Sequence, residues 1–190
     1  MAYRKTEKVL AQLAAKRESL IDAATDIVER DGVAMLTVDR VALEAGASVG
    51  GLYKHFPDKV ELYAAVVARV LNGDSIAITM AASRERHPIP KLYAALVALY
   101  RRFTRRRLRA AMFADDAYCA GLQLALRPLI TSCLDDPDSN VRLHSAAVLG
   151  ALAGLYESVG QGDGVASFAA RFALRGLGIS PRVLAGFADN

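Results

Sequence analysis

The sequence predicts an all-α protein of about nine helices, and three observations favour this fold class. Apolar residues recur at helical spacing along most of the chain, and no segment alternates apolar and polar residues as an exposed strand would. Glycine, proline and aspartate clusters separate these periodic stretches. With 190 residues, of which 53% are hydrophobic, the chain is long enough to bury a core in one or two compact units.

The first predicted helix precedes two short helices that a tight turn joins. It carries an apolar stripe between Leu20 and Val28 and stops at Asp31–Gly32. Thr37 is a good N-cap for the second helix, because its hydroxyl can accept a hydrogen bond from a backbone N–H of the first turn. Gly46 follows the end of this helix and can adopt the left-handed conformation at little cost.

The third predicted helix is too short and too polar to serve mainly as core. Ser48 can cap it, and Leu52 with Phe56, four residues later, supplies its inward face. Gly50 and Gly51 each lower helix propensity by about 1 kcal/mol relative to alanine. This composition suits a helix whose backbone must approach another molecule closely. A helix-turn-helix that places its second helix in the major groove of DNA needs such a small helix.

Residues from about Arg17 to Leu71 resemble the DNA-binding domain of the tetracycline-repressor (TetR) family of transcriptional regulators. The matching features are Ile21–Ala24 with Ile27–Val28, Asp31–Gly32, Leu36–Val38, Ala45–Ser48, Leu52–Phe56, Lys59 and Leu62. The resemblance covers about the first third of the chain. It implies an N-terminal arm over 1–16, a helix-turn-helix DNA-binding domain of three helices over 17–62, and an effector-binding and dimerisation domain over 63–190. The glycine turn alone is also compatible with an ordinary pair of packed helices.

Candidate DNA contacts lie on and around the third helix. Val49 offers a methyl surface for a thymine methyl group, and Lys54 can reach a guanine edge or a phosphate. Tyr53 and Lys59 are interpreted as phosphate anchors, in line with the family resemblance; the alternatives are a half-buried tyrosine that closes the small core and a solvated lysine. The full set of candidate DNA-binding residues is Thr37, Arg40, Ser48, Val49, Gly50, Gly51, Tyr53, Lys54, His55 and Lys59.

Net charge does not locate the DNA-binding part. Residues 1–60 hold nine Lys/Arg and nine Asp/Glu, so the surplus of +4 comes from the rest of the chain. Within the arm, Arg4, Lys5, Lys8, Lys16 and Arg17 can touch phosphates or belong to a solvated tail. An arginine cluster is expected on a solvated surface, where Asp115 and Asp116 can pair with part of it. Its members are Arg101, Arg102, Arg105, Arg106, Arg107 and Arg109.

Later helices follow from periodicity and from breaks in it. Asp58 is expected to cap a long fourth helix with a bend or interruption at 72–74, and residues 87–90 are expected to break the helical pattern. Further helices are expected over 92–103, 105–114, 121–134 with a kink or boundary at Pro128, 140–159 and 165–178.

A stripe of small residues on the helix over 140–159 permits close helix approach. The resemblance implies that this helix and the last one form a four-helix bundle with those of a second copy; an internal helix hairpin is the alternative. The candidate dimer residues are Ala146, Gly150, Gly154, Ser158, Val165, Phe168, Ala169, Phe172 and Ala173.

The resemblance also implies an effector pocket between residues 74 and 160. A largely aliphatic lining would suit an apolar or aromatic effector, although each candidate is also a plausible core or surface residue. The candidate walls are Val70, Tyr100, Phe103, Met112, Leu126, Leu152 and Tyr156, with Tyr118, Gln123 and Arg127 as polar tips.

The leading hypothesis is a homodimeric repressor that binds a palindromic double-stranded operator and is released by a small-molecule effector. No enzyme motif, metal-ligand spacing or cofactor-binding loop is found, and Cys119 and Cys133 form no redox motif. No membrane partner is expected, since the longest apolar run is too short to span a bilayer and no signal-peptide core is found; a cytoplasmic location is the default. An all-α enzyme or small-molecule carrier, and a DNA-binding protein without an effector, are the rival hypotheses.

Overall fold

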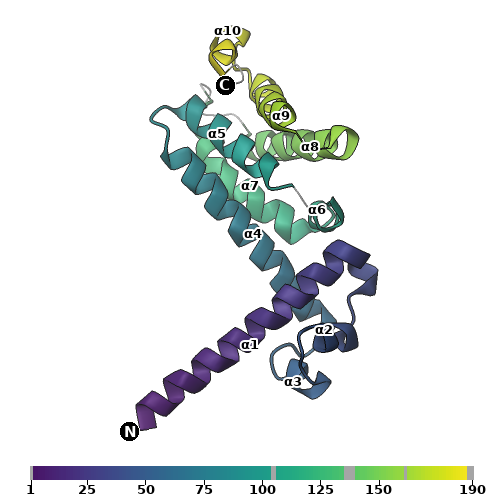
Figure 1. The fold of residues 1–190 in the computed structure, drawn as a ribbon. Helices are drawn as coiled ribbons and strands as arrows, with labels where there is room; N and C mark the ends of the chain where they lie inside the picture. Colours follow the sequence, from purple (N-terminus) through teal and green to yellow (C-terminus); the bar gives the residue numbers. More distant parts are fainter. Residues whose placement is uncertain (1, 104–105, 135–139, 161, 188–190) are drawn as a thin grey trace. The chain divides into compact units, whose positions relative to one another are not determined.

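The computed structural model describes residues 2–103, 106–134, 140–160 and 162–187 (Figure 1). In these ranges the chain forms ten α-helices and two short 3₁₀ helices, η1 and η2, with no strand, so the all-α prediction is confirmed. The elements are α1 Ala2–Asp31, η1 Val33–Met35, α2 Val38–Glu44, α3 Val49–Tyr53, α4 Lys59–Ser83, α5 Pro88–Arg101, α6 Arg106–Phe113, α7 Asp116–Thr131, α8 Val141–Val159, α9 Asp163–Gly176, α10 Pro181–Leu184 and η2 Ala185–Phe187.

The helices group into two compact units. The N-terminal unit comprises residues 1–69 with 105–112, and the C-terminal unit comprises 70–104 with 113–190. The division differs from the boundary at 62/63 that the sequence led us to expect. Helix α4 runs through that boundary, and α6 groups with the N-terminal unit although it lies far along the chain.

The N-terminal unit is built on α1, whose apolar stripe forms its core. Leu20, Ile27 and Val28 are fully buried, as expected from their spacing. The helix begins at Ala2, so the predicted arm over 1–16 is helical and continuous with α1 rather than a tail. Arg69 of α4 pairs with Glu18 and Asp22 on the exposed side of α1.

Helix α4 begins where the sequence predicted and runs on past the predicted interruption. Asp58 Oδ1 accepts a hydrogen bond from the backbone N–H of Glu61 at 2.8 Å, as expected for the cap. The expected bend at 72–74 is wrong. Asp74 is fully buried, and its carboxylate accepts from Arg102 Nε at 2.6 Å and from Tyr118 Oη at 2.7 Å. Because Arg102, the residue that follows α5, and Tyr118 of α7 satisfy this carboxylate, Asp74 does not compete for backbone N–H groups and the helix continues.

By length and composition, α4 is also the one helix in the described ranges that could cross a membrane. Polar residues interrupt the apolar ones along α4, so no uninterrupted apolar run marks this helix in the sequence. A core helix of a globular protein passes the same test. Leu62, Val66 and Ile78 are buried, although only 28% of the apolar window of α4 is buried within the chain.

The C-terminal unit packs α5 against α9, α7 against α8, and α8 against α9. The helical pattern breaks between Ser83 and Pro88, so the predicted break is present but lies earlier than 87–90. Pro88 already occupies the first turn of α5, where the missing N–H of proline is harmless. Helix α7 begins at Asp116, earlier than predicted, and contains Pro128 without ending there. The short α10 was not predicted.

Candidate nucleic-acid interface

Two side-chain caps define the helix-turn-helix. Thr37 Oγ1 accepts a hydrogen bond from the backbone N–H of Arg40 at 3.4 Å at the start of α2. Ser48 Oγ accepts from the backbone N–H of Gly51 at 3.0 Å at the start of α3. Both caps were predicted from the sequence, and each holds the first turn of a helix too short to be stable alone.

The turn between α2 and α3 depends on Gly46, which has φ 58°. The N–H of Gly46 donates to the Leu43 carbonyl, and the N–H of Ala47 donates to the Ala42 carbonyl at 2.8 Å. This pair of bonds is a Schellman motif, which a left-handed glycine completes at low strain. Lys16 Nζ of α1, a predicted phosphate contact of the arm, donates to the Gly46 carbonyl of this turn at 3.3 Å.

Helix α3 is held from behind by two buried side chains. Leu52 is fully buried and Phe56 is 1% exposed, as predicted. The Arg17 guanidinium carbon lies 4.8 Å from the centre of the Phe56 ring, a cation–π contact. Arg17, like Lys16 a residue of the predicted basic arm, thus also stabilises the domain by contacting one of its core side chains.

The opposite side of α3 faces outward. Val49 is 37% exposed and Tyr53 51% exposed, and Gly50 and Lys54 are also exposed. His55 and Gly51 are half-buried. The surface combines a methyl group, a bare backbone, a phenol and a cation, which are the group types that reach base edges and phosphates.

Lys59 lies at the first residue of α4, beside the Asp58 cap, and its side chain is exposed. Thr37 is exposed at the start of α2. Thr37 and Lys59 therefore lie at helix N-termini, where backbone N–H groups also favour an anion, whereas Tyr53 is the last residue of α3.

Four charged residues join the end of α1 to α2. Arg30 donates to both Glu44 carboxylate oxygens, at 3.0 and 2.9 Å, and its Nε donates to Asp31 at 3.1 Å. Arg40 in turn donates to Asp31. The Arg30 hydrogen bond holds the pKa of Glu44 below its ordinary value.

This network was not predicted. It engages Arg40, a candidate DNA contact, on the α1 side of α2, and a contact with phosphate would require the Arg40–Asp31 pair to open. The sequence signal for it is weak, because the Arg30 and Glu44 partners lie 14 residues apart on different helices.

Three described members of the arginine cluster, Arg101, Arg102 and Arg107, are exposed as predicted, whereas Arg109 is only 4% exposed. Arg102 also pairs with buried Asp74. Arg107 donates to the Arg30 carbonyl within the N-terminal unit. Asp115, a predicted partner of the cluster, caps α7, where its carboxylate accepts from the Tyr118 N–H at 2.9 Å. Arg105 and the Arg106 side chain lie outside the described residues.

Several candidate effector residues form an aromatic cluster in the core of the C-terminal unit. The rings of Tyr100 and Phe103 have centroids 5.4 Å apart, and Tyr156 packs edge-on against both. Tyr100 Oη donates to the Gly160 carbonyl at 2.8 Å, and burial raises the pKa of this phenol. Tyr118 Oη, an expected ligand contact, is instead bonded to Asp74.

The remaining effector candidates do not share one environment. Leu126 and Leu152 are fully buried, Gln123 is half-buried and Arg127 is exposed. Met112 is buried in the N-terminal unit, whereas the others belong to the C-terminal unit. The sequence pattern identified aromatic residues of the core here. It could not distinguish residues that line a pocket from residues that pack within the core.

The predicted dimer stripe lies on the surface of the C-terminal unit. All four of its members on α8, Ala146, Gly150, Gly154 and Ser158, are exposed. On α9, Phe168 and Phe172 are 51% and 52% exposed, with ring centroids 6.3 Å apart, and Val165 is half-buried. Ala169 and Ala173 were wrongly placed at this surface, because they are buried inside the unit.

The family match and the similar known proteins agree on the kind of protein that the N-terminal part of this chain resembles. Residues 20–66 match the family described as "Bacterial regulatory proteins, tetR family". The HTH-type transcriptional regulator SrpR of Pseudomonas putida is 38% identical over 61 residues, which cover 32% of this chain and 29% of the relative. The HTH-type transcriptional repressor BepR of Brucella suis biovar 1 (strain 1330) is 31% identical over 80 residues, 42% of this chain and 38% of the relative. The matched stretches thus span less than half of these relatives.

The fold resembles solved structures over most of the chain. The structure of RolR in complex with its ligand resorcinol superposes with a TM-score of 0.69 and 19% identity, covering 95% of this chain and 96% of the other. At this identity the likeness establishes the fold, and functional inference depends on the interface itself.

Proposed function

We propose, from the premise that this chain belongs to the tetR family of bacterial regulatory proteins, that it represses transcription by binding a palindromic DNA operator as a homodimer. A small-molecule effector then releases it. Its place of action is the cytoplasm, where the operator lies. The proposal has three parts: DNA binding by α3, dimerisation through α8 and α9, and effector binding in the C-terminal unit.

The observation that carries the proposal is the outward face of α3. Leu52 and Phe56 anchor the helix, the Thr37 and Ser48 caps fix its turns, and Val49 and Tyr53 stand exposed on the other side. A protruding five-residue helix contributes little to a core, so a structural role alone does not account for this arrangement.

Dimerisation follows from the geometry of DNA. One helix-turn-helix contacts only a few base pairs, and two copies spaced by about 34–36 Å reach successive major grooves on one side of a duplex. The exposed small-residue stripe of α8 and the exposed Phe168 and Phe172 of α9 supply a surface for the second copy.

Effector release requires a ligand with different affinities for two conformations of the dimer. The Tyr100–Phe103–Tyr156 cluster supports an aromatic or apolar effector for this protein. The RolR structure contains resorcinol, an aromatic ligand, in a related fold.

The DNA-binding part is tested by selecting bound fragments from genomic DNA of the source organism and measuring affinity at several salt concentrations. We expect one palindromic sequence to be enriched and affinity to fall steeply with salt, because phosphate contacts release counterions. Lys59→Gln should weaken binding and lower the slope of log affinity against log salt by about 1. Tyr53→Phe should weaken binding while keeping the ring.

Arg182→Gln is the matched control, since Arg182 is an exposed cation on α10 of the C-terminal unit. It should leave the affinity and the salt slope unchanged. If purified protein enriches no sequence, or if Lys59→Gln and Arg182→Gln behave alike, DNA recognition by α3 is wrong. An all-α enzyme or carrier would then be the better hypothesis.

A further inference from the structure

A pocket of about 410 Å³ lies within the C-terminal unit, where α5 meets α9, the end of α4 and the C-terminal segment. We call it the α5 pocket. One of its walls is the side of α5 that carries Ala94, Val97 and Ala98, which helical spacing places on one face. Because these side chains are small, they leave space beside the helix. The volume is that of a small-molecule site.

A buried hydroxyl group that lines this pocket lacks a hydrogen-bond partner. Ser167 of α9 is 8% exposed and lines the pocket. The other buried serine and threonine of the described chain, Ser145 and Thr25, each donate at 2.7 Å to the carbonyl four residues earlier. Ser167 Oγ makes no such bond and has no other partner among the described residues. Leaving a buried hydroxyl unpaired is unfavourable, so a ligand group that bonds Ser167 would gain affinity.

Aromatic rings form another wall of the α5 pocket. Tyr93 of α5 and Phe187 of η2 both line it, and their rings stack with centroids 4.5 Å apart. Arg171 Nη1 of α9 donates to the Phe187 carbonyl at 3.0 Å, which fastens the C-terminal segment to α9. A flat apolar ligand body can therefore pack against fixed aromatic rings and the small side chains of α5.

Charged side chains lie where the pocket meets solvent. Arg84 and Glu85 line the pocket, follow the end of α4 and are exposed. The Arg84 guanidinium makes no hydrogen bond or ion pair with a described residue, and it can bind a carboxylate through two parallel N–H···O bonds. Arg101 also lines the pocket but already interacts with another residue, so we assign the carboxylate to Arg84. Glu85 disfavours a second negative charge on the ligand, which selects a monoanion.

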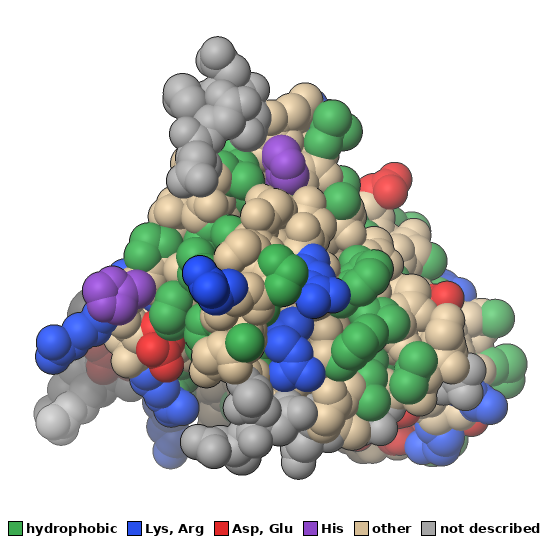
Figure 2. All heavy atoms as spheres, turned by 90° about the horizontal axis from the view of Figure 1, so that it is seen from above, with side chains coloured by type: hydrophobic (Ala, Val, Ile, Leu, Met, Phe, Trp, Pro, Cys, Tyr) green, Lys and Arg blue, Asp and Glu red, His purple; other side chains and the backbone are tan. Residues whose placement is uncertain are grey.

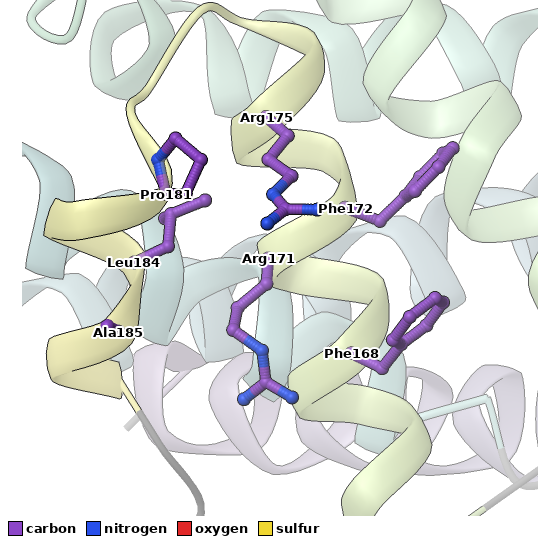
Figure 3. Close-up of a pocket in the computed structure, with 7 residues that line it drawn as sticks. All are labelled: Phe168, Arg171, Phe172, Arg175, Pro181, Leu184 and Ala185. Carbon is purple, nitrogen blue, oxygen red and sulfur yellow. The ribbon is translucent and has the colours of Figure 1, made fainter.

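A cation beside apolar surface is not by itself a binding site in this molecule. Figure 2, a view from above, shows basic side chains among hydrophobic ones near its middle. In Figure 3, Arg171 and Arg175 extend from α9 toward the space that faces Pro181 and Leu184, in a groove whose described lining holds no side-chain hydroxyl. The unpaired Ser167 hydroxyl distinguishes the α5 pocket from these surfaces.

We propose that the α5 pocket binds an aromatic monocarboxylate with a hydroxyl group remote from the carboxylate, in which Arg84 binds the carboxylate and Ser167 binds the hydroxyl. The exposed position of Arg84 places the charge at the solvent edge, and the burial of Ser167 places the hydroxyl inside. The pocket shares no described lining residue with the Tyr100–Phe103–Tyr156 cluster, and the proposal does not depend on DNA binding.

The test is calorimetric titration of the full chain with three matched compounds. The probe 4-hydroxybenzoate carries both groups, benzoate lacks the hydroxyl, and 4-hydroxybenzamide lacks the charge. We expect 4-hydroxybenzoate to bind and benzoate to bind about fivefold more weakly. The amide should bind about tenfold more weakly than 4-hydroxybenzoate, or not at all.

Two substitutions assign the ligand groups to their partners. Ser167→Ala should raise Kd for 4-hydroxybenzoate by about fivefold and leave Kd for benzoate unchanged, because benzoate has no hydroxyl to lose. The variant should fold normally, since alanine is the better helix former and no described hydrogen bond is removed. Arg84→Gln should raise Kd for both carboxylates by about tenfold.

Arg86→Gln is the matched control, since Arg86 is an exposed cation two residues beyond Arg84 and does not line the pocket. It should leave Kd for all three compounds unchanged. Three results would overturn the proposal: no binding of 4-hydroxybenzoate, a Ser167→Ala effect that is as large for benzoate as for 4-hydroxybenzoate, or equal effects of Arg84→Gln and Arg86→Gln.

Discussion

Gly50 and Gly51 are neighbours in α3, yet the structure gives them different reasons to be glycine. A Cβ on Gly51 would lie 3.0 Å from Ser48 Oγ, the oxygen that caps the helix. A Cβ on Gly50 would meet no atom of the chain within 4 Å. The fold therefore constrains position 51, whereas it leaves position 50 open to a side chain, and a partner that approaches the exposed backbone would favour glycine there.

This difference gives a prediction for Gly50→Ala. The added methyl group should stabilise the protein by up to about 1 kcal/mol through helix propensity, while it weakens operator binding by about tenfold through a clash with DNA. Urea unfolding measures the first effect and a DNA titration the second. Gly176→Ala, at the exposed end of α9 with open space around it, is the control and should not change DNA affinity. Unchanged operator affinity in Gly50→Ala would contradict the close-approach role.

At the level of single residues, the sequence predicted what is local. The hydroxyl caps Thr37 and Ser48 act on N–H groups three residues away, so their roles follow from the chain order alone. The Arg30–Glu44 pair joins two helices, and Arg17 contacts Phe56 across the domain. Such contacts depend on how the helices pack together, and the spacing of apolar residues in the sequence does not reveal this packing.

The same limit applies to whole elements. The expected break at Gly73–Asp74 followed sound local rules, and it failed because Arg102 and Tyr118 from other helices satisfy the Asp74 carboxylate. The helix over 140–159 was predicted closely, since Asn140 caps it and Gly160 ends it. Contacts with other helices thus let α4 continue past its predicted break. For α8, local sequence signals were enough to predict where the helix begins and ends.

The attachment of α2 to α1 gives a prediction about acid. The Arg30 hydrogen bond lowers the folded-state pKa of Glu44 from 4.5. A lowered carboxyl pKa contributes stability that is fully present above the unfolded-state pKa and is lost as the pH falls through the folded-state value. Wild type should therefore be more stable than Glu44→Gln at neutral pH, and this difference should narrow as the pH falls below 4.5.

The measurement is urea unfolding of both proteins at several pH values. We expect a small difference at neutral pH, because the pair is largely exposed and screened by solvent. Glu7→Gln, an exposed change on α1, is the control and should show no such narrowing. A Glu44→Gln difference that stays constant down to acid pH would mean that the ion pair does not hold α2 in solution.

At the scale of the whole molecule, an apolar surface remains on the C-terminal unit after both helices α8 and α9 have buried their inner faces. Leu143 on α8 is 67% exposed, and Phe168 and Phe172 on α9 are about half exposed. An apolar face of this kind is typical of an interface. Gly150 and Gly154 lie on the same helix, and a Cβ at either would meet nothing within 4 Å.

Gly150→Glu should therefore disrupt the dimer without damaging the fold. Glutamate is a better helix former than glycine, and the position is open within one chain. In a symmetric dimer the substitution introduces two charges into one apolar interface. We expect light scattering to show a dimer for wild type and a shift to monomer for the variant, with operator affinity reduced by at least about tenfold because two half-sites no longer bind together.

Ala120→Glu is the matched control, since Ala120 is an exposed helical residue on α7, outside the proposed interface. It should leave the mass and the operator affinity unchanged. A Gly150→Glu protein that remains dimeric and binds the operator normally would exclude α8 as the dimer surface. A protein that becomes monomeric but keeps its operator affinity would instead separate DNA recognition from dimerisation, because each α3 would then be sufficient by itself.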